Sequence, residues 1–356
     1  MKKRLGLVYG GKSAEHEVSL STARAVIQAI DFNRYEVIPV YITYEGEWRK
    51  GQALESPVET LGELRLQGSG IDKPDSIQDF LNGGGALPDV IFPLLHGTNG
   101  EDGTVQGFFE VMNIPYVGNG VLASSAGMDK VSMKQLFAQV GLKQVPYVHF
   151  IRSGWKQAQE QLVEQMENEL GYPMFVKPAN LGSSVGITKA TERTSLIDAV
   201  ELALKFDRRI IVEQGVTARE IELGVKGNDD AQCSVPGEIK PVTDFYDYDA
   251  KYKDGNTELI IPAKVTAAVA EEMEDMAVRA YKVLDCSGLV RADFFVTADD
   301  DVLINEVNTM PGFTPVSMFP LLWQNSGTTY SALIDELIEL AFARHAEKSK
   351  IQYMMD

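Results

Sequence analysis

The first 43 residues predict a strand, a glycine turn, a helix and a second strand, an order that constrains the fold more than any other feature of the sequence. An apolar run at residues 5–9 ends at Gly10 and Gly11, and apolar residues then recur at helical spacing across residues 18–30. Residues 35–43 predict the second strand. Because a helix between two parallel strands packs on a face of their sheet, we expect the chain to begin with a parallel sheet covered by helices.

The length and charge of the chain limit its domain count and its partners. A chain of 356 residues exceeds one ordinary core and predicts two or three domains. The formal net charge of −18 disfavours nucleic acid and an anionic membrane surface, because both repel an acidic protein. Cys233 and Cys286 form no disulfide or zinc pattern, and no apolar stretch approaches the roughly 18 residues of a membrane span. We therefore expect a cytoplasmic protein without a membrane or nucleic-acid partner.

The rest of the chain combines helices and strands in a way that predicts an α+β fold after the α/β beginning. The order of elements in residues 51–86 stays open, because this segment is polar and glycine-rich. Residues 244–256 are polar and rich in tyrosine, and predict a long loop of the kind usually reserved for function. Further strands are expected at residues 88–95, 114–118, 145–151, 209–214, 221–225, 233–239 and 258–262, and helices at residues 105–112, 128–140, 155–170, 195–206, 265–284 and 328–344.

The stretch Phe-Val-Lys-Pro-Ala-Asn-Leu-Gly-Ser-Ser-Val-Gly, residues 175–186, runs from a buried-strand pattern into a small flexible loop with Lys177 at its start. A P-loop requires glycines before the lysine and a helix after it. Here the lysine precedes the glycines, and residues 185–187 predict another strand. The stretch can bind phosphate through an ammonium and backbone N–H groups, but it is not a P-loop.

Two apolar segments near the C-terminus, residues 289–296 and 302–308, predict an antiparallel hairpin because turn-forming residues separate them. Pairing Thr297 with Val302 fixes the rest of the register. Side chains alternate along a strand, so four polar residues then share one face of the hairpin. The cross-strand pairs on this face are Asp293 with Glu306 and Arg291 with Asn308.

Two carboxylates that face each other across a hairpin repel, and a divalent cation reverses that repulsion. Asp293, Glu306 and Asn308 supply the oxygen ligands that magnesium prefers. The alternative is a solvent-facing hairpin whose charges only keep the protein soluble. Together with Lys177, the metal ligands describe a nucleoside triphosphate site, and backbone donors at residues 310–314 could form an oxyanion hole.

The chain resembles the D-alanine–D-alanine ligases of the ATP-grasp superfamily over essentially its whole length. Six motifs in the expected order carry the resemblance, and six in sequence are far more specific than any one alone. They are Gly-Gly-Lys-Ser-Ala-Glu-His-Glu-Val-Ser at residues 10–19, Leu-His-Gly-Thr-Asn-Gly-Glu-Asp-Gly at 95–103, the stretch 177–186, Phe-Tyr-Asp-Tyr-Asp-Ala-Lys-Tyr at 245–252, Arg-Ala-Asp at 291–293 and Asn-Glu-Val-Asn-Thr-Met-Pro-Gly at 305–312.

The resemblance implies an ATP-grasp fold in which two α+β domains enclose ATP and the loop after Lys177 closes over the phosphates as a flap. It implies a substrate-binding domain at residues 1–121, a central domain at 122–215 and a C-terminal domain at 216–356, in a homodimer. It also implies two Mg²⁺ ions, for which Mn²⁺ is a plausible substitute. The implied ATP ligands are Lys130, Lys177, Ser183 and Lys251 toward the phosphates and Glu213, Gln214, Val216 and Glu220 toward adenine and ribose; the implied metal ligands are Asp293, Glu306 and Asn308.

The resemblance also implies how the first substrate is held. Glu15 would receive its ammonium group, and His96 would lie near its carboxylate. Ser183 and Tyr252 would join Glu15 in a hydrogen-bonded set that links the flap, the long loop and the first domain.

The second half of the implied site lies after the hairpin. Arg291 and the Gly312 N–H would stabilise the tetrahedral oxyanion, and Ser317 with the Met318 N–H would bind the carboxylate of the second substrate. Tyr252 matches the pattern of dipeptide-forming relatives, whereas Met318 replaces a leucine common in the family.

The implied activity is ATP-dependent ligation of two D-alanines through an acyl phosphate, for synthesis of peptidoglycan precursors. One alternative is an ATP-grasp ligase that uses D-lactate or D-serine as acceptor. Another is a non-catalytic ATP-binding regulator, which would need the lysines and the metal ligands but has no reason to retain Glu15, Arg291 and Ser317.

Overall fold

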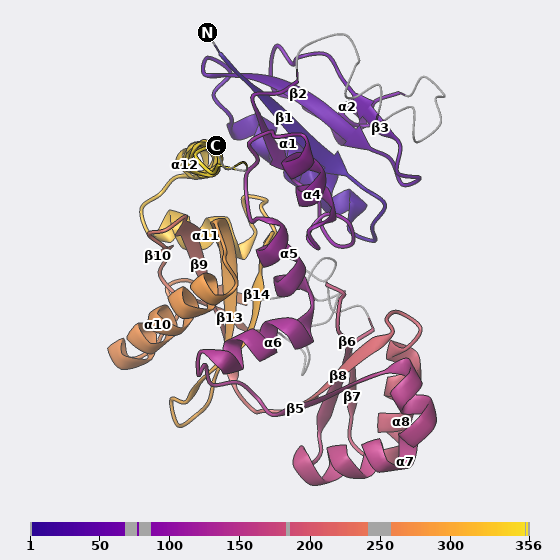
Figure 1. The fold of residues 1–356 in the computed structure, drawn as a ribbon. Coiled ribbons are helices and arrows are strands. Elements are labelled where there is room, and N and C mark those ends of the chain that lie inside the picture. Colours follow the sequence, from indigo (N-terminus) through magenta and orange to yellow (C-terminus); the bar gives the residue numbers. More distant parts are fainter. Residues whose placement is uncertain are drawn as a thin grey trace.

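The computed structural model describes residues 2–67, 77, 87–182, 186–240, 258–352 and 354, whose strands form three sheets (Figure 1). The first sheet is mainly parallel, and every strand pairing in the other two is antiparallel. The predicted combination of an α/β beginning with α+β parts is therefore confirmed. None of the helices in the described ranges has the length and apolarity needed to cross a lipid bilayer.

The first sheet contains the predicted parallel unit. β1 (Lys3–Gly10) pairs in parallel with β2 (Tyr35–Ile42) on one side and with β4 (Val90–Pro93) on the other. α1 (His16–Ala29) connects β1 to β2, and β3 (Trp48–Lys50) closes the edge in the antiparallel direction. Because β1 is central, the loop that follows it opens at the carboxyl end of the sheet, where ligands of such sheets bind.

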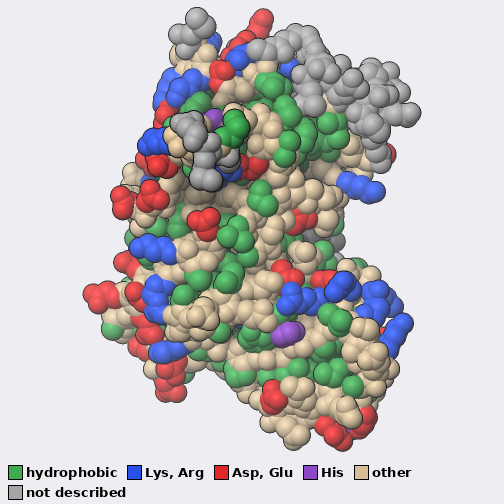
Figure 2. Space-filling model, viewed as in Figure 1, with side chains coloured by type: hydrophobic (Ala, Val, Ile, Leu, Met, Phe, Trp, Pro, Cys, Tyr) green, Lys and Arg blue, Asp and Glu red, His purple; other side chains and the backbone are tan. Residues whose placement is uncertain are grey.

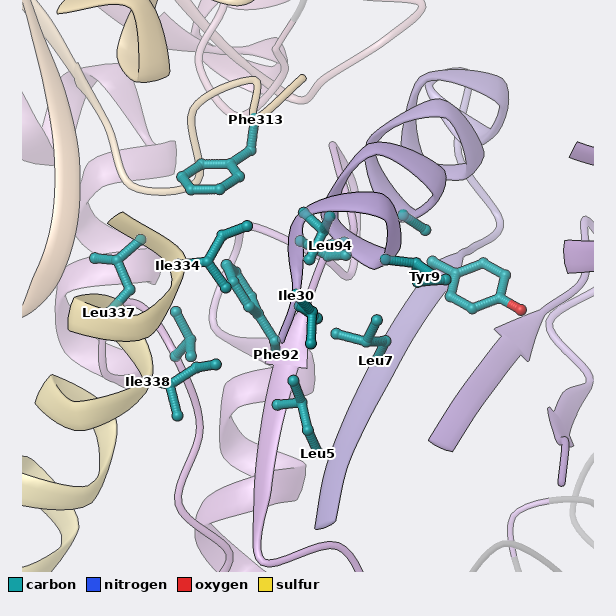
Figure 3. Close-up of a cluster of buried hydrophobic side chains, with 14 of the residues drawn as sticks. Leu5, Leu7, Tyr9, Ile30, Phe92, Leu94, Phe313, Ile334, Leu337 and Ile338 are labelled. Carbon is teal, nitrogen blue, oxygen red and sulfur yellow. The ribbon is translucent and has the colours of Figure 1, made fainter. Parts of the chain in front are cut away.

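Different helices cover the two faces of the first sheet. Val8 faces α4 (Thr104–Val111), whereas Leu7 packs in a core that includes α1 and α12 (Tyr330–Lys348). Figure 3 shows Ile338 of α12 beside the strands of this sheet. The last helix of the chain thus completes the core of the first sheet, while the proposed domain boundaries stay predictions.

The central sheet carries its apolar and polar side chains on opposite faces. Val176 and Val212 point into the core that the sheet forms with α7 and α8. Figure 1 shows both helices beside this sheet. Their neighbours Lys177 and Glu213 project to the other face, where Val131 of α6 also packs. The strand order is β5 (Tyr147–Ile151), β8 (Arg209–Gln214), β6 (Met174–Pro178) and β7 (Thr188–Ala190), and the helices are α6 (Lys130–Gln139), α7 (Arg152–Glu169) and α8 (Arg193–Ala203).

The third sheet is covered on one face by α10 and α6 and on the other by α11. Leu223 lies in the core with α10, whereas its neighbour Gly224 lies against Phe319 of α11. Arg291 pairs with Gly224 and therefore projects to the α11 side. The strand order is β12 (Glu258–Ile260), β11 (Gly237–Lys240), β9 (Arg219–Gly227), β13 (Gly288–Val296) and β14 (Val302–Asn308), with β10 (Gln232–Cys233) also on β9, and the helices are α10 (Ala267–Val283) and α11 (Met318–Asn325).

Two helices were not predicted. The helix expected at 128–140 is confirmed as α6, but α5 (Val121–Met128) precedes it. Asp129 separates the two and caps α6 by accepting a hydrogen bond from the Ser132 N–H at 2.8 Å. α11 was not predicted. It is short and contains Pro320, which a helix tolerates in its first turn.

Two strand predictions were wrong. In the segment 114–118 only Tyr116 pairs, through an isolated bridge to Ile91. The strand expected at 233–239 is divided into β10 and β11, and Pro236 lies in the gap, where its missing N–H cannot contribute to a strand ladder. In the segment 185–187, residue 185 lies outside the described residues and the next strand is β7, which begins at Thr188.

Candidate active site

The β13–β14 hairpin has the predicted register at its polar end. Asp293 pairs with Glu306 and Arg291 pairs with Asn308, as expected. The expected pairing of Thr297 with Val302 is wrong, because Val296 is the partner of Val302. A β-bulge after Asp293 absorbs the difference of one residue, so the polar pairs still face each other.

The carboxylate of Asp293 is held by two neighbours on the same face of the sheet. Arg291 donates from Nε to Oδ1 and from a terminal nitrogen to Oδ2, both at 2.8 Å, and Asn308 Nδ2 donates to Oδ2 at 2.8 Å. Arg291 Nε also lies 2.9 Å from Glu222 Oε2. Burial alone would lower the pKa of Arg291, but Asp293 and Glu222 raise it well above its usual value.

A second cluster on the central sheet places two lysines against one buried carboxylate. Lys177 Nζ lies 2.5 Å from Glu213 Oε2, and Lys134 Nζ lies 3.0 Å from Glu213 Oε1. Burial alone would raise the pKa of Glu213, but the two ammonium groups lower it to about 2. The opposite holds for Lys134, because its burial lowers the lysine pKa despite the nearby carboxylate.

Lys130 connects the two clusters. Its Nζ lies 3.5 Å from Glu306 Oε2 on the third sheet and donates at 2.9 Å to the Leu181 carbonyl in the loop after β6. Its backbone N–H donates to the Ala179 carbonyl at 2.8 Å. The predicted phosphate-binding stretch and the predicted metal ligands are therefore brought to the same place by α6.

The donor set on the hairpin fits a hard divalent cation. Asp293 and Glu306 offer carboxylate oxygens and Asn308 an amide oxygen, the chemistry that Mg²⁺ accepts while it keeps positions for water and phosphate. In the described part of the chain no three His, Cys, Asp or Glu side chains form a metal cage. Such an incomplete set is expected where substrate phosphates supply the remaining ligands.

The N-terminal part of the chain contributes two acidic residues beside a histidine, the buried Glu15 and the partly buried Glu101. His96 is buried, with Nδ1 at 3.4 Å from Glu101 Oε1 and Nε2 at 3.4 Å from the Thr22 hydroxyl. Burial alone would lower the pKa of His96, but Glu101 and Glu15 outweigh it and raise that pKa. A Cβ on Gly182, where the predicted flap begins, would lie 3.9 Å from both the Glu15 and Glu101 carboxylates.

The loop after β14 forms a compact turn above α11. Ser317 is the N-cap of α11, and its hydroxyl accepts the Thr314 N–H at 3.1 Å and lies 2.8 Å from the Thr314 hydroxyl. A Cβ on Gly312 would lie 3.1 Å from the Ser317 hydroxyl, so only glycine fits without a shift. Met318 is buried against Ile239.

The predicted adenine and ribose ligands lie where β8 passes into β9. The Gln214 side chain donates to the Leu170 carbonyl at 2.8 Å, and its backbone N–H donates to the Pro146 carbonyl at 3.0 Å. Val216 is half-buried, and the negative charge of Glu220 acts on Lys177 and helps to raise the Lys177 pKa. Ser183, Lys251 and Tyr252 lie outside the described residues.

Three side chains at the site were missed from the sequence. Glu101 belongs to a quoted motif, and its spacing of five from His96 was the available signal. Lys134 follows Lys130 by one helical turn, a spacing that places both on one face of α6. Glu222 gave no local signal, because it reaches Arg291 only through strand pairing.

Solved structures with the same architecture define the class. The model superposes on a D-alanine-D-alanine ligase from Coxiella burnetii with a TM-score of 0.80 at 31% identity, covering 98% of this chain and 96% of that chain. It superposes on the VanG D-Ala:D-Ser ligase from Enterococcus faecalis with a TM-score of 0.81 at 33% identity, covering 96% and 100%. The fold is thus the ATP-grasp fold of ATP-dependent ligases.

Sequence comparison identifies the family within that class. The family models described as D-ala D-ala ligase N-terminus and C-terminus match residues 4–119 and 136–339. A D-alanine–D-alanine ligase from Bacillus licheniformis is 58% identical, covering 99% of each chain, and one from Listeria monocytogenes serovar 1/2a is 55% identical, covering 100% of each. The chain belongs to the D-alanine–D-alanine ligase family.

Proposed function

We propose that this protein joins two molecules of D-alanine to D-alanyl-D-alanine with ATP, which is converted to ADP and phosphate, and that the dipeptide enters peptidoglycan precursors. Family membership at 55–58% identity over the whole chain supports this enzyme activity. The observation that carries the proposal in the structure is α6, which brings the lysine cluster and the acidic hairpin to one place through Lys130.

The chemistry explains why ATP is needed. A carboxylate and an amine do not condense at neutral pH, because the carboxylate is a poor electrophile. Transfer of the γ-phosphoryl group to the first D-alanine makes an acyl phosphate, which the second amine attacks with loss of phosphate. Positioning and charge neutralisation supply most of the catalysis in such transfers, so no nucleophilic side chain is required.

The lysines and the hairpin are assigned to the nucleotide. Lys130, Lys177 and Lys251 are assigned to phosphate oxygens, and Ser183 is assigned to the same part of the nucleotide. The segment from Glu213 to Glu220, with Gln214 and Val216, binds adenine and ribose. Two Mg²⁺ ions, or Mn²⁺ in their place, neutralise the phosphates when bound at the hairpin. Their ligands are Asp293, Glu306 and Asn308.

The remaining residues are assigned to the two amino acids. Glu15, held by Ser183 and Tyr252, receives the first ammonium, and His96 lies near the first carboxylate. Burial acts to lower the pKa of His96, but the carboxylates of Glu101 and Glu15 raise it, a direction that suits contact with a carboxylate. The charge and donors of Arg291 stabilise the oxyanion together with the Gly312 N–H. The contacts that fix Arg291 on β13 support its assignment.

The second subsite sets the acceptor. Ser317 and the Met318 N–H at the start of α11 bind the second carboxylate, which suits the positive end of a helix. D-serine is the second candidate acceptor, because the VanG D-Ala:D-Ser ligase is among the similar structures. The use of ATP supports a cytoplasmic reaction, and a homodimer is part of the proposal.

The proposed function is tested by phosphate release with ATP and Mg²⁺ in the presence of D-alanine, D-alanine with D-serine, D-alanine with D-lactate, or L-alanine. The products are identified by mass. We expect D-alanine alone to give D-alanyl-D-alanine and L-alanine to give no product. Phosphate release that does not depend on the amino acid would remove the ligase assignment and leave the non-catalytic regulator.

A further inference from the structure

Lys134 is the most deeply buried lysine of the site, and no role follows for it from the proposed function. Only 1% of its side chain is exposed, against 11% for Lys177 and for Lys130. Its Nζ is closed off from solvent. The carboxylate of Glu213 contacts both Lys134 and Lys177, so Glu213 links Lys134 to Lys177.

Within this cluster one carboxylate, itself 3% exposed, faces two ammonium groups. The negative charges of Glu306 and Glu220 also act on Lys177. With Lys134 present, its positive charge balances Glu213, so that Glu213 does not add to the negative charges that act on Lys177. Without Lys134, the same carboxylate would balance Lys177 alone. In a poorly solvated site a one-to-one ion pair attracts an incoming anion much less than an unbalanced cation.

We propose that Lys134 is a positioning residue that neutralises Glu213, so that the ammonium of Lys177 stays available to the phosphates of the nucleotide. The inference rests on the proposed function, because it takes Lys177 as a phosphate ligand. The fold supports these separate roles. Lys134 comes from α6, whereas Lys177 is the next-to-last residue of β6, which leads directly into the loop toward the phosphates.

A purely structural role is the competing explanation. The pair could serve only to attach α6 to β8, since Val131 of α6 and Ile211 of β8 pack together beside it. The two explanations differ in their dependence on Glu213. A structural attachment is lost when either charge is removed, whereas the need for Lys134 as a neutralising charge disappears once Glu213 has no charge.

The test measures binding of magnesium tripolyphosphate by calorimetry. This probe has no base or ribose, so contacts of Glu213 with adenine do not enter. The full-length variants are Lys134→Met, Glu213→Gln and the double variant, with Lys177→Met as the control for the phosphate site. Thermal unfolding confirms that each variant is folded.

We expect Lys134→Met to weaken tripolyphosphate binding about tenfold, the size expected for losing one charge in a partly desolvated site. In the Glu213→Gln background the same substitution should change binding by at most about twofold, because the competing carboxylate is gone. The comparison of Glu213→Gln with the double variant can be made even if Lys134→Met alone does not fold. The double variant lacks the Glu213 carboxylate, so removal of Lys134 leaves no buried carboxylate without its balancing charge.

Three results overturn the inference alone: unchanged binding in folded Lys134→Met, a tenfold loss from Lys134→Met that persists in the Glu213→Gln background, or a similar loss in folded Glu213→Gln by itself, which is the result that a purely structural attachment predicts. Failure of the wild-type protein to bind the probe, or full binding by Lys177→Met, would instead overturn the proposed phosphate site, and this inference with it.

Discussion

Replacing Glu306 by Gln is expected to reduce turnover of ATP with D-alanine by at least about 10³-fold, because a bound metal supplies several kcal/mol of transition-state charge stabilisation. Gln keeps the size of the side chain but removes the negative charge that Glu306 presents beside Asp293. The measurement is kcat at saturating ATP over a range of Mg²⁺ concentrations, with urea unfolding as the check on folding.

The matched control is Asp299→Asn, the same kind of substitution in the exposed turn of the same hairpin. It should leave kcat and the Mg²⁺ dependence unchanged. Folded Glu306→Gln protein that retains turnover within about tenfold of wild type would refute its assignment as a metal ligand.

Replacing Arg291 by Lys should lower kcat about 10²- to 10³-fold, the usual loss for one oxyanion donor. Lys keeps the charge but lacks the planar fork with which Arg291 engages Asp293 and Glu222. A donor that acts on the transition state lowers kcat and kcat/KM together, so steady-state kinetics in ATP and in D-alanine separate this role from substrate binding.

Arg219→Lys is the control for this substitution. Arg219 also forms a bidentate ion pair in the third sheet, with Glu238 at 2.9 and 2.6 Å, but it is not assigned to the site. It should keep nearly wild-type kcat. Equal losses of kcat in Arg219→Lys and Arg291→Lys would mean that activity reports only the integrity of the sheet.

The hairpin shows what local sequence determines. Side-chain alternation with a period of two was sufficient to place Asp293 opposite Glu306 and Arg291 opposite Asn308. The bulge after Asp293 was not predictable from that alternation, because one extra residue changes the pairing only on the turn side. The turn-side pairing of Thr297 was therefore wrong while the polar end was right.

Contacts between segments that are distant in the sequence could not be predicted from it, for a physical reason. Glu213 and Lys134 lie on β8 and α6, and only the packing of α6 against two different sheets brings them together. In the same way, α12 completes the core of the first sheet from the other end of the chain. Periodicity identifies which face of a helix is apolar, but it does not identify the sheet that covers this face.

The net charge of the chain limits the kind of site that can bind phosphate, but it does not locate that site. The net charge of −18 implied that any phosphate ligand must meet a local cationic pocket. Figure 2 shows Lys and Arg side chains gathered over part of the lower half of the molecule, while acidic side chains are scattered elsewhere on the same face. Lys130 and Lys177, the described lysines assigned to the phosphates, are largely buried, so their part of the pocket is built from the interior and not from this surface.

The central claim is that the γ-phosphoryl group passes to the carboxylate of the first D-alanine. It is tested most directly with D-alanine that carries ¹⁸O in both carboxylate oxygens, by measuring the mass of the phosphate released in the presence of ATP and Mg²⁺. The account predicts one ¹⁸O atom in each phosphate and one in the new peptide carbonyl, because the C–O bond of the acyl phosphate breaks when the amine attacks. Phosphate without ¹⁸O, released together with D-alanyl-D-alanine, would contradict it.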